Sequence, residues 1–276
     1  MRILFASSAL VMLAPLAMAA DWDVATQHKL MSTHILVAGA TGRNGGAILA
    51  ALEAAGAKPR AMTRNIDKAR VKAGDAHDWV QADVTKPETL AAAFRGIDVI
   101  IDAVATSNIE GPNGTEQVDL EGTRHLIAAA RSAGVKRVIM ITGMLVGLPF
   151  SNLPPPMAKA LGAKREAEKL LIASGLDYVI LRPTGILDRL AGIYRVRIIA
   201  SSDYRPSQEE VQMRPANSGA PSTQPPAGTI SRADLARVAI ASSIDRAAAR
   251  RVFVVTQGVE PADDAWRATI GKMPRE

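Results

Sequence analysis

A strand, a tight turn and a helix are predicted in succession by Ile35-Leu36-Val37-Ala38-Gly39-Ala40-Thr41-Gly42-Arg43-Asn44-Gly45-Gly46-Ala47-Ile48. The apolar run that opens this stretch is typical of a buried strand, and helix-forming residues follow the turn. Glycines at 39, 42 and 45 allow the backbone to turn tightly and to approach a ligand closely. A helix directs its unpaired N–H groups and the positive end of its dipole toward its start. The stretch therefore predicts a binding site for the diphosphate of a dinucleotide.

The sequence beyond the turn indicates which dinucleotide is bound. A second strand, predicted over 60–63, ends at Arg64, where NAD-binding folds of this type carry a carboxylate for the ribose hydroxyls. Arg43, inside the glycine turn, supplies a second guanidinium group. Two such groups suit a 2′-phosphate, which they bind through charge-assisted, bidentate hydrogen bonds. We therefore predict NADP(H) in preference to NAD(H); the alternative is that Arg64 is a solvated loop arginine.

Strands and helices alternate along the rest of the chain. The apolar runs that predict further strands lie at 79–82, 99–104, 138–141, 177–181 and 251–255. The helices expected between them span about 46–55, 66–73, 85–95, 115–133, 157–174 and 231–244. This alternation predicts an α/β fold with a doubly wound, mostly parallel sheet, the Rossmann fold. Ligands bind such sheets at the carboxyl ends of the strands.

Composition narrows the classes of ligand. The chain has 276 residues and is 48% hydrophobic, which suits one large α/β domain or one domain with a small appendage. Its net charge is +6, but Lys and Arg are scattered among acidic residues, so we expect no nucleic-acid binding. It has no cysteine, and its four histidines show no metal-ligand spacing. We therefore expect a small-molecule ligand and no metal site, and the oligomeric state stays open.

The first residues have the three parts of a secretory signal peptide. Met1-Arg2 is positively charged, residues 3–16 are apolar, and Ala17-Met18-Ala19 matches a small-x-small cleavage site. The apolar run is too short to predict a stable membrane span in the mature chain. We therefore expect a periplasmic or secreted protein. The alternative is a cytoplasmic protein whose translation starts at Met31, just before the first strand.

The pattern as a whole resembles that of an atypical short-chain dehydrogenase/reductase, in particular the NAD(P)H-binding, NmrA-like and biliverdin/flavin-reductase-like members. The resemblance covers roughly 33–258. Besides the glycine turn, it rests on Lys164-Arg165-Glu166-Ala167-Glu168, Leu181-Arg182-Pro183 and Ile230-Ser231-Arg232-Ala233-Asp234. Each motif alone is modest, and their order and spacing make the resemblance specific.

The resemblance implies roles for particular segments of the site. Residues 39–45 correspond to the pyrophosphate turn, Asp83-Val84 to the pair that contacts the adenine, and 103–106 to the segment that lines the ribose. Together with Arg64, the expected cofactor-binding residues are Gly39, Thr41, Gly42, Arg43, Asn44, Gly45, Arg64, Asp83, Val84, Ala103, Ala105, Thr106, Lys164 and Pro183.

One departure from the family's pattern concerns the chemistry. Catalytic members use Tyr-x-x-x-Lys, in which the lysine lowers the pKa of the tyrosine one helical turn away. The lysine corresponds to Lys164, so the tyrosine position is Ala160, and the usual serine position is Thr142. Thr142 and Lys164 remain the candidate catalytic residues. Their alternatives are a strand-end threonine that caps its own turn and a surface helix lysine.

Two functions are compatible with this departure. The first is an oxidoreductase that transfers hydride from NADPH to a conjugated acceptor, such as a flavin or a quinone, which needs no proton from a tyrosine. The second is a protein that binds NADP(H) without turnover, as a redox sensor or scaffold of NmrA-like type. Sugar epimerisation needs the absent tyrosine and is disfavoured.

These observations divide the chain into five segments. We expect a signal peptide (1–19), a linker (20–32), a dinucleotide-binding domain (33–258) with a substrate-covering insertion (186–229), and a C-terminal tail (259–276).

Overall fold

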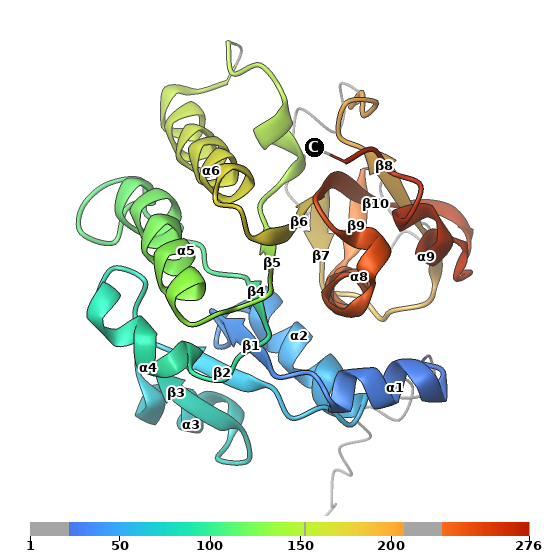
Figure 1. Ribbon diagram of the computed structural model, residues 1–276. Helices are drawn as coiled ribbons and strands as arrows, with labels where there is room; N and C mark the ends of the chain where they lie inside the picture. The colour runs from blue at the N-terminus through green and yellow to red at the C-terminus, as the bar shows by residue number, and fades with distance from the viewer. Residues whose placement is uncertain (1–21, 152, 207–227, 276) are drawn as a thin grey trace, which may run out of the picture.

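A computed structural model, which describes residues 22–151, 153–206 and 228–275, confirms the predicted doubly wound α/β fold. The strands of the central sheet lie in the order β3-β2-β1-β4-β5-β6-β10-β8, and they run parallel except for β8, which is antiparallel to β10 (Figure 1). Their bounds are β1 (Ile35–Ala38), β2 (Arg60–Thr63), β3 (Asp78–Gln81), β4 (Val99–Asp102), β5 (Arg137–Ile141), β6 (Asp177–Pro183), β8 (Tyr194–Ala200) and β10 (Arg251–Pro261).

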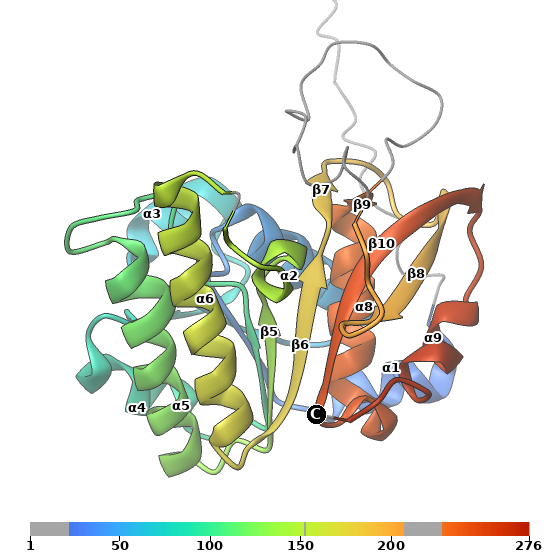
Figure 2. The ribbon, with the colours of Figure 1, turned by 90° about the horizontal axis from the view of Figure 1, so that it is seen from above.

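Helices cover both faces of the sheet, as Figure 2 shows. One face carries α1 (Val24–Met31), α2 (Arg43–Ala54), α8 (Arg232–Ile244) and α9 (Ala265–Ile270), and the other carries α4 (Leu90–Phe94), α5 (Gly122–Ser132) and α6 (Pro155–Ala173). A further α-helix, α3 (Ile66–Ala73), connects β2 to β3. The central strands are buried on both sides, which explains their nearly continuous apolar sequences.

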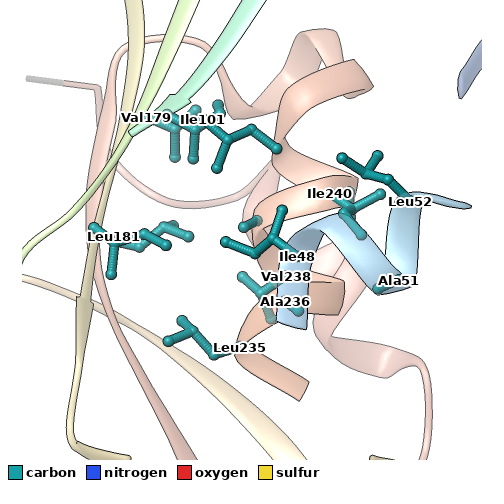
Figure 3. Packing of buried hydrophobic residues seen from close by; sticks show 14 of the residues in the cluster. Ile48, Ala51, Leu52, Ile101, Val179, Leu181, Leu235, Ala236, Val238 and Ile240 are labelled. Carbon is teal, nitrogen blue, oxygen red and sulfur yellow. The ribbon is translucent and has the colours of Figure 1, made fainter. Parts of the chain in front are cut away.

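The helices α2 and α8 pack directly against each other (Figure 3). Ile48 and Leu52 of α2 lie beside Val238 and Ile240 of α8, and all four are buried in one cluster with strand residues such as Leu181. Each aliphatic side chain buried in this way contributes about 1.5–3 kcal/mol. The first turns of both helices consequently lie together at the carboxyl edge of the sheet, where Arg232 donates a hydrogen bond to Asn44.

The two ends of the described chain are more ordered than the sequence indicated. The expected linker contains α1, whose Leu30 is fully buried, and the Arg267 guanidinium lies 4.4 Å from the Trp22 ring centroid. The expected tail contains the end of β10 and α9, with Trp266 buried. Tertiary contacts, rather than a strong local pattern, hold these short segments.

The expected insertion, 186–229, contributes to the fold in two places. Its strand β8 joins the edge of the central sheet, and β7 (Gly185–Leu187) pairs in parallel with β9 (Thr229–Ser231). The expected signal peptide and residues 207–227 of the expected insertion lie outside the described residues. Among the described helices, none has the length and apolar character needed to cross a membrane.

Candidate functional site

The turn after β1 is as tight as its glycines predict. Gly39 has a φ of +73°, a conformation that side chains disfavour. A Cβ atom on Gly45 would lie only 2.2 Å from the Gly39 carbonyl oxygen, and one on Gly39 would lie 2.9 Å from that of Ala103. A Cβ on Gly46 would make an ordinary contact at 3.5 Å. Glycine is therefore required by the space available at 39 and 45, but not at 46.

The first turn of α2 is suited to bind an anion. The helix begins at Arg43, earlier than predicted, with Gly42 as N-cap. No side chain caps its free N–H groups, and no acidic residue lies in the first turn. The Thr41 carbonyl accepts a hydrogen bond from Lys72, and the Asn44 side chain accepts one from Arg232. The uncapped amides and the helix dipole together make a cradle that fits a diphosphate group.

Cations surround this cradle. Arg64 is exposed at the end of β2 and makes no ion pair with any described residue. β2 adjoins the turn, since Ala40 N donates to the Met62 carbonyl at 3.2 Å. Lys72, on α3, places its Nζ 2.5 Å from the Thr41 carbonyl oxygen. Lys72 was not predicted as part of this site, because nothing in the local sequence distinguishes it from the other surface lysine of α3, Lys68.

Asp83 and Val84, the expected adenine contacts, hold the loop after β3 in place. Oδ1 of Asp83 accepts hydrogen bonds from the Thr85 amide and hydroxyl, each at 2.9 Å. The Val84 side chain is buried, and a Cβ on Gly122 would lie 2.6 Å from it. The Val84 carbonyl accepts from Nδ1 of His125 at 2.8 Å. The side chain of Val84 is thus engaged in packing against α5.

The segment 103–106 leads from β4 past the glycine turn. Ala103 is half-buried beside Gly39, and Ala105 is exposed. The Thr106 hydroxyl donates to the Asn113 carbonyl at 2.8 Å and so closes the loop that follows β4. Ala103 is therefore the member of this segment that lies closest to the diphosphate cradle.

Lys164 forms part of a buried cluster of charges. Its ammonium group donates to Oδ1 of Asp119 at 2.7 Å, and Asp119 is 2% exposed. Asp102, the last residue of β4, interacts electrostatically with both. Burial, together with the charge of Asp119, raises the pKa of Asp102 to about 6, and Lys164 partly opposes this shift. Lys164 is consequently not a solvated surface lysine.

Thr142 lies at a second buried ion pair. Its hydroxyl donates to Oε1 of Glu168 at 2.6 Å. Arg182, on β6, binds the other carboxylate oxygen of Glu168 at 2.5 Å and also donates to Ser201. Pro183, the next residue of β6, is buried opposite Val255 of β10. The single hydroxyl proton of Thr142 is engaged by the buried Glu168 carboxylate, and the Lys164 ammonium group donates one of its three protons to Asp119.

One face of α6 brings these groups together. Residues 160, 164 and 168 are spaced by four, so they project from the same side of the helix. Ala160 is half-buried there and leaves no hydroxyl at the tyrosine position. Sequence reasoning missed Glu168, Asp119 and Asp102 as members of the site. The spacing of Glu168 from Lys164 was the available signal; the contacts of Asp102 and Asp119 come from distant parts of the chain.

A cavity of about 290 Å³ lies next to Arg182 and Ser201. Its lining combines apolar side chains, such as Met144, Leu148 and Val254, with the polar side chains of Ser201, Ser202, Tyr204 and Arg205. This mixed lining could accept a ring system that carries polar groups.

The sequence of this chain is similar to those of known proteins. A family model described as NAD(P)H-binding matches residues 39–246, from the glycine turn to just beyond α8. The photosystem II assembly factor Ycf39 of Cyanophora paradoxa is 35% identical over 165 residues, which are 60% of this chain and 49% of that protein. This chain therefore spans about half the length of Ycf39. An uncharacterised sugar epimerase, YhfK, of Bacillus subtilis (strain 168) is 31% identical over 209 residues, 75% of this chain and 86% of that protein.

A solved structure supports the fold. The putative NAD-dependent epimerase/dehydratase from Bacillus halodurans has a TM-score of 0.68 at 24% identity, over 88% of this chain and 100% of that chain. The family match covers the glycine turn, the β4 and β5 ends and α6, which are the parts that form the candidate site. The chain therefore belongs to the NAD(P)H-binding family, as the resemblance to atypical short-chain dehydrogenases/reductases predicted.

Proposed function

We propose that this protein is an NADP(H)-dependent oxidoreductase that transfers hydride to a small conjugated acceptor, such as a flavin or a quinone. The observation that carries the proposal is the diphosphate cradle, in which a Cβ at Gly45 would collide with the Gly39 carbonyl. The preference for NADP(H) is supported by Arg64, an exposed guanidinium without an ion pair among the described residues, where a carboxylate would favour NAD(H).

The residues of the chain bind and orient the two reactants. The amides at the start of α2 bind the diphosphate, while Arg64 and Arg43 hold the 2′-phosphate. The bound nicotinamide supplies the hydride. Ala103, Thr142 and Lys164 would line the nicotinamide half, which lies on the side of β4 and β5 away from Arg64 in this proposal. Stacking and orientation of two ring systems are then the main contribution of the protein to the rate.

The side-chain proton donors near Thr142 and Lys164 favour an acceptor that takes its proton from solvent. Ala160 supplies no hydroxyl, the Thr142 hydroxyl donates to Glu168, and the Lys164 ammonium donates to Asp119. Reduction of an isolated carbonyl needs a proton from the enzyme, whereas a reduced flavin or quinone can exchange protons with water. The partly apolar cavity beside Ser201 supports the same class of acceptor.

Oxidation of NADPH tests the proposal. The full chain is incubated with NADPH and a panel of flavins and quinones, and the loss of absorbance at the reduced nicotinamide band is followed. We expect turnover with at least one conjugated acceptor and slower turnover with NADH. Tight NADPH binding without turnover across the panel would contradict the reductase proposal.

A second candidate function is a binding protein without turnover. It is supported by Ala160, which removes the tyrosine of the usual relay, and by the similarity to Ycf39, a protein named as an assembly factor. In this case NADPH would change the affinity for a protein partner while remaining unconsumed. Pull-down experiments with and without NADPH would distinguish this function from the reductase.

We further propose that the chain is exported. The signal-peptide pattern supports export, and the packing of Trp22 and α1 supports a mature protein that retains residues before Met31. Mass spectrometry of the purified natural protein tests this proposal. A mature start near Ala20 is expected, and a start at Met31 or Ser32 would overturn it.

A further inference from the structure

A guanidinium group outside the glycine turn reaches the start of α2. Arg232 is the first residue of α8, and its side chain is only 11% exposed. It donates to the side chain of Asn44, the second residue of α2. Burial lowers the pKa of Arg232, as expected for a cation that has lost part of its hydration. Arg232 thus lies beside the uncapped amides that form the diphosphate cradle.

A carboxylate connects this guanidinium to the turn. Asp188, just after β7, binds Nε of Arg232 through Oδ1 at 2.6 Å and binds Arg43 through Oδ2. Asp188 is 57% exposed and Arg43 is 72% exposed, so only the Arg232 side of this bridge is buried. One carboxylate therefore bridges two arginines at the edge of an anion site. A phosphate has the same charge sign and the same bidentate geometry toward guanidinium groups.

We propose that Arg232 binds the diphosphate of the dinucleotide, and that the carboxylate of Asp188 is an internal anion which the diphosphate displaces. This inference rests on the proposed NADP(H) binding and extends it to α8. The packing of α2 against α8 holds Arg232 in place, so that it needs little reorganisation to contact the ligand. Displacement of Asp188 releases one end of the segment 189–191. The other end stays fixed, because Gly192 N donates a hydrogen bond to Oδ1 of Asp234 at 3.0 Å.

The two roles predict opposite effects on affinity. Asp188→Asn removes the competing charge, so it should tighten NADPH binding by about threefold, the effect of an exposed ion pair. Arg232→Met removes a charge-assisted contact and should weaken binding by at least about tenfold. The increase in NADPH affinity caused by Asp188→Asn should be smaller in the Arg232→Met background. In that background Arg232, one of the two cations that Asp188 pairs with, is already absent.

Isothermal titration calorimetry on the full chain measures these effects with NADPH, NADH and ADP. Binding to the diphosphate predicts that Arg232→Met weakens all three ligands by the same factor. A loss confined to NADPH would overturn the assignment, because it would place Arg232 at the 2′-phosphate. Asp263→Asn and Arg195→Met, which break a surface ion pair at β8, are the matched controls and should keep wild-type affinity.

The outcomes separate this inference from the proposed function. If the wild-type chain binds no nicotinamide dinucleotide, the proposed function fails. If the wild type binds NADPH but both variants keep its affinity, only the roles of Arg232 and Asp188 are overturned. Circular dichroism of each variant verifies that the fold is retained before titration.

Discussion

The glycine turn and the face of α6 that carries residues 160, 164 and 168 differ in whether their charged groups are already paired. At the turn, the backbone itself supplies the binding groups, and the cations around it are exposed or paired with an exposed carboxylate. On α6, Lys164 and Glu168 are engaged by partners that the fold has buried with them. The turn is therefore open to an external anion, whereas the α6 face has already neutralised its charges.

This contrast indicates that the turn binds the ligand and that the α6 face stabilises the fold. Backbone amides and exposed surface cations can bind a charged ligand without a large desolvation cost. Buried pairs such as Glu168–Arg182 instead fix the positions of side chains and are costly to break. We therefore expect changes at the turn to act on ligand affinity and changes at α6 to act on stability.

The largest effect on ligand affinity is expected at the turn itself. Gly45→Ala places a Cβ 2.2 Å from the Gly39 carbonyl, so the start of α2 must move. Losing one or two amide contacts to a charged diphosphate should weaken NADPH binding by about 100-fold. Gly46→Ala is the matched control, since its Cβ has 3.5 Å of space. Equal affinities for the two variants by calorimetry would show that the cradle does not bind the ligand.

The second effect tests the buried side of the comparison. Glu168→Ala leaves Arg182 buried without its carboxylate and should reduce the free energy of unfolding by about 3–5 kcal/mol. Glu166→Ala, which breaks an exposed pair with Lys169 on the same helix, should cost at most about 1 kcal/mol. Urea denaturation measures both. A Glu168 variant as stable as the Glu166 variant would remove the distinction between α6 and the turn.

The third effect depends on pH. The folded-state pKa of Asp102, about 6, exceeds the ordinary value of 3.8, so the folded protein binds the extra proton between these values. Stability is therefore lost as pH rises through this window, by up to about 3 kcal/mol. Asp102→Asn should remove that loss, so its advantage over wild type should grow from pH 4 to pH 7. Parallel stability curves for the two proteins would contradict the shifted pKa.

The smallest effect concerns the choice of dinucleotide. Arg64→Asp should weaken NADPH binding by about tenfold and strengthen NADH binding, because a carboxylate suits ribose hydroxyls and repels a 2′-phosphate. Lys58→Asp makes a similar charge change just before β2, at the opposite edge of the sheet, and should leave the preference unchanged. An unaltered ratio of NADPH to NADH affinity in the Arg64 variant would refute its phosphate role.

Local sequence patterns predicted much of the fold. The strand over 60–63 has the predicted bounds, and Ser231 caps α8 by accepting a hydrogen bond from Asp234 N, as expected. These features depend on neighbouring residues. The β8 strand carried a usable signal, since buried Val196 and Ile198 alternate with exposed arginines, but its antiparallel place at the sheet edge depends on β10.

The site was less predictable than the fold. The glycine turn follows from backbone sterics, which a local pattern encodes. The partners of Thr142 and Lys164 lie 26 and 45 residues away along the chain, so no spacing rule identifies both. The bridge from Asp188 to Arg43 and Arg232 joins segments that only the tertiary fold brings together.

Calorimetric titration of the purified wild-type chain with NADPH tests the central claim most directly. One NADPH is expected to bind per chain, and NADH is expected to bind more weakly. Absence of binding by both reduced and both oxidised nicotinamide dinucleotides would contradict it.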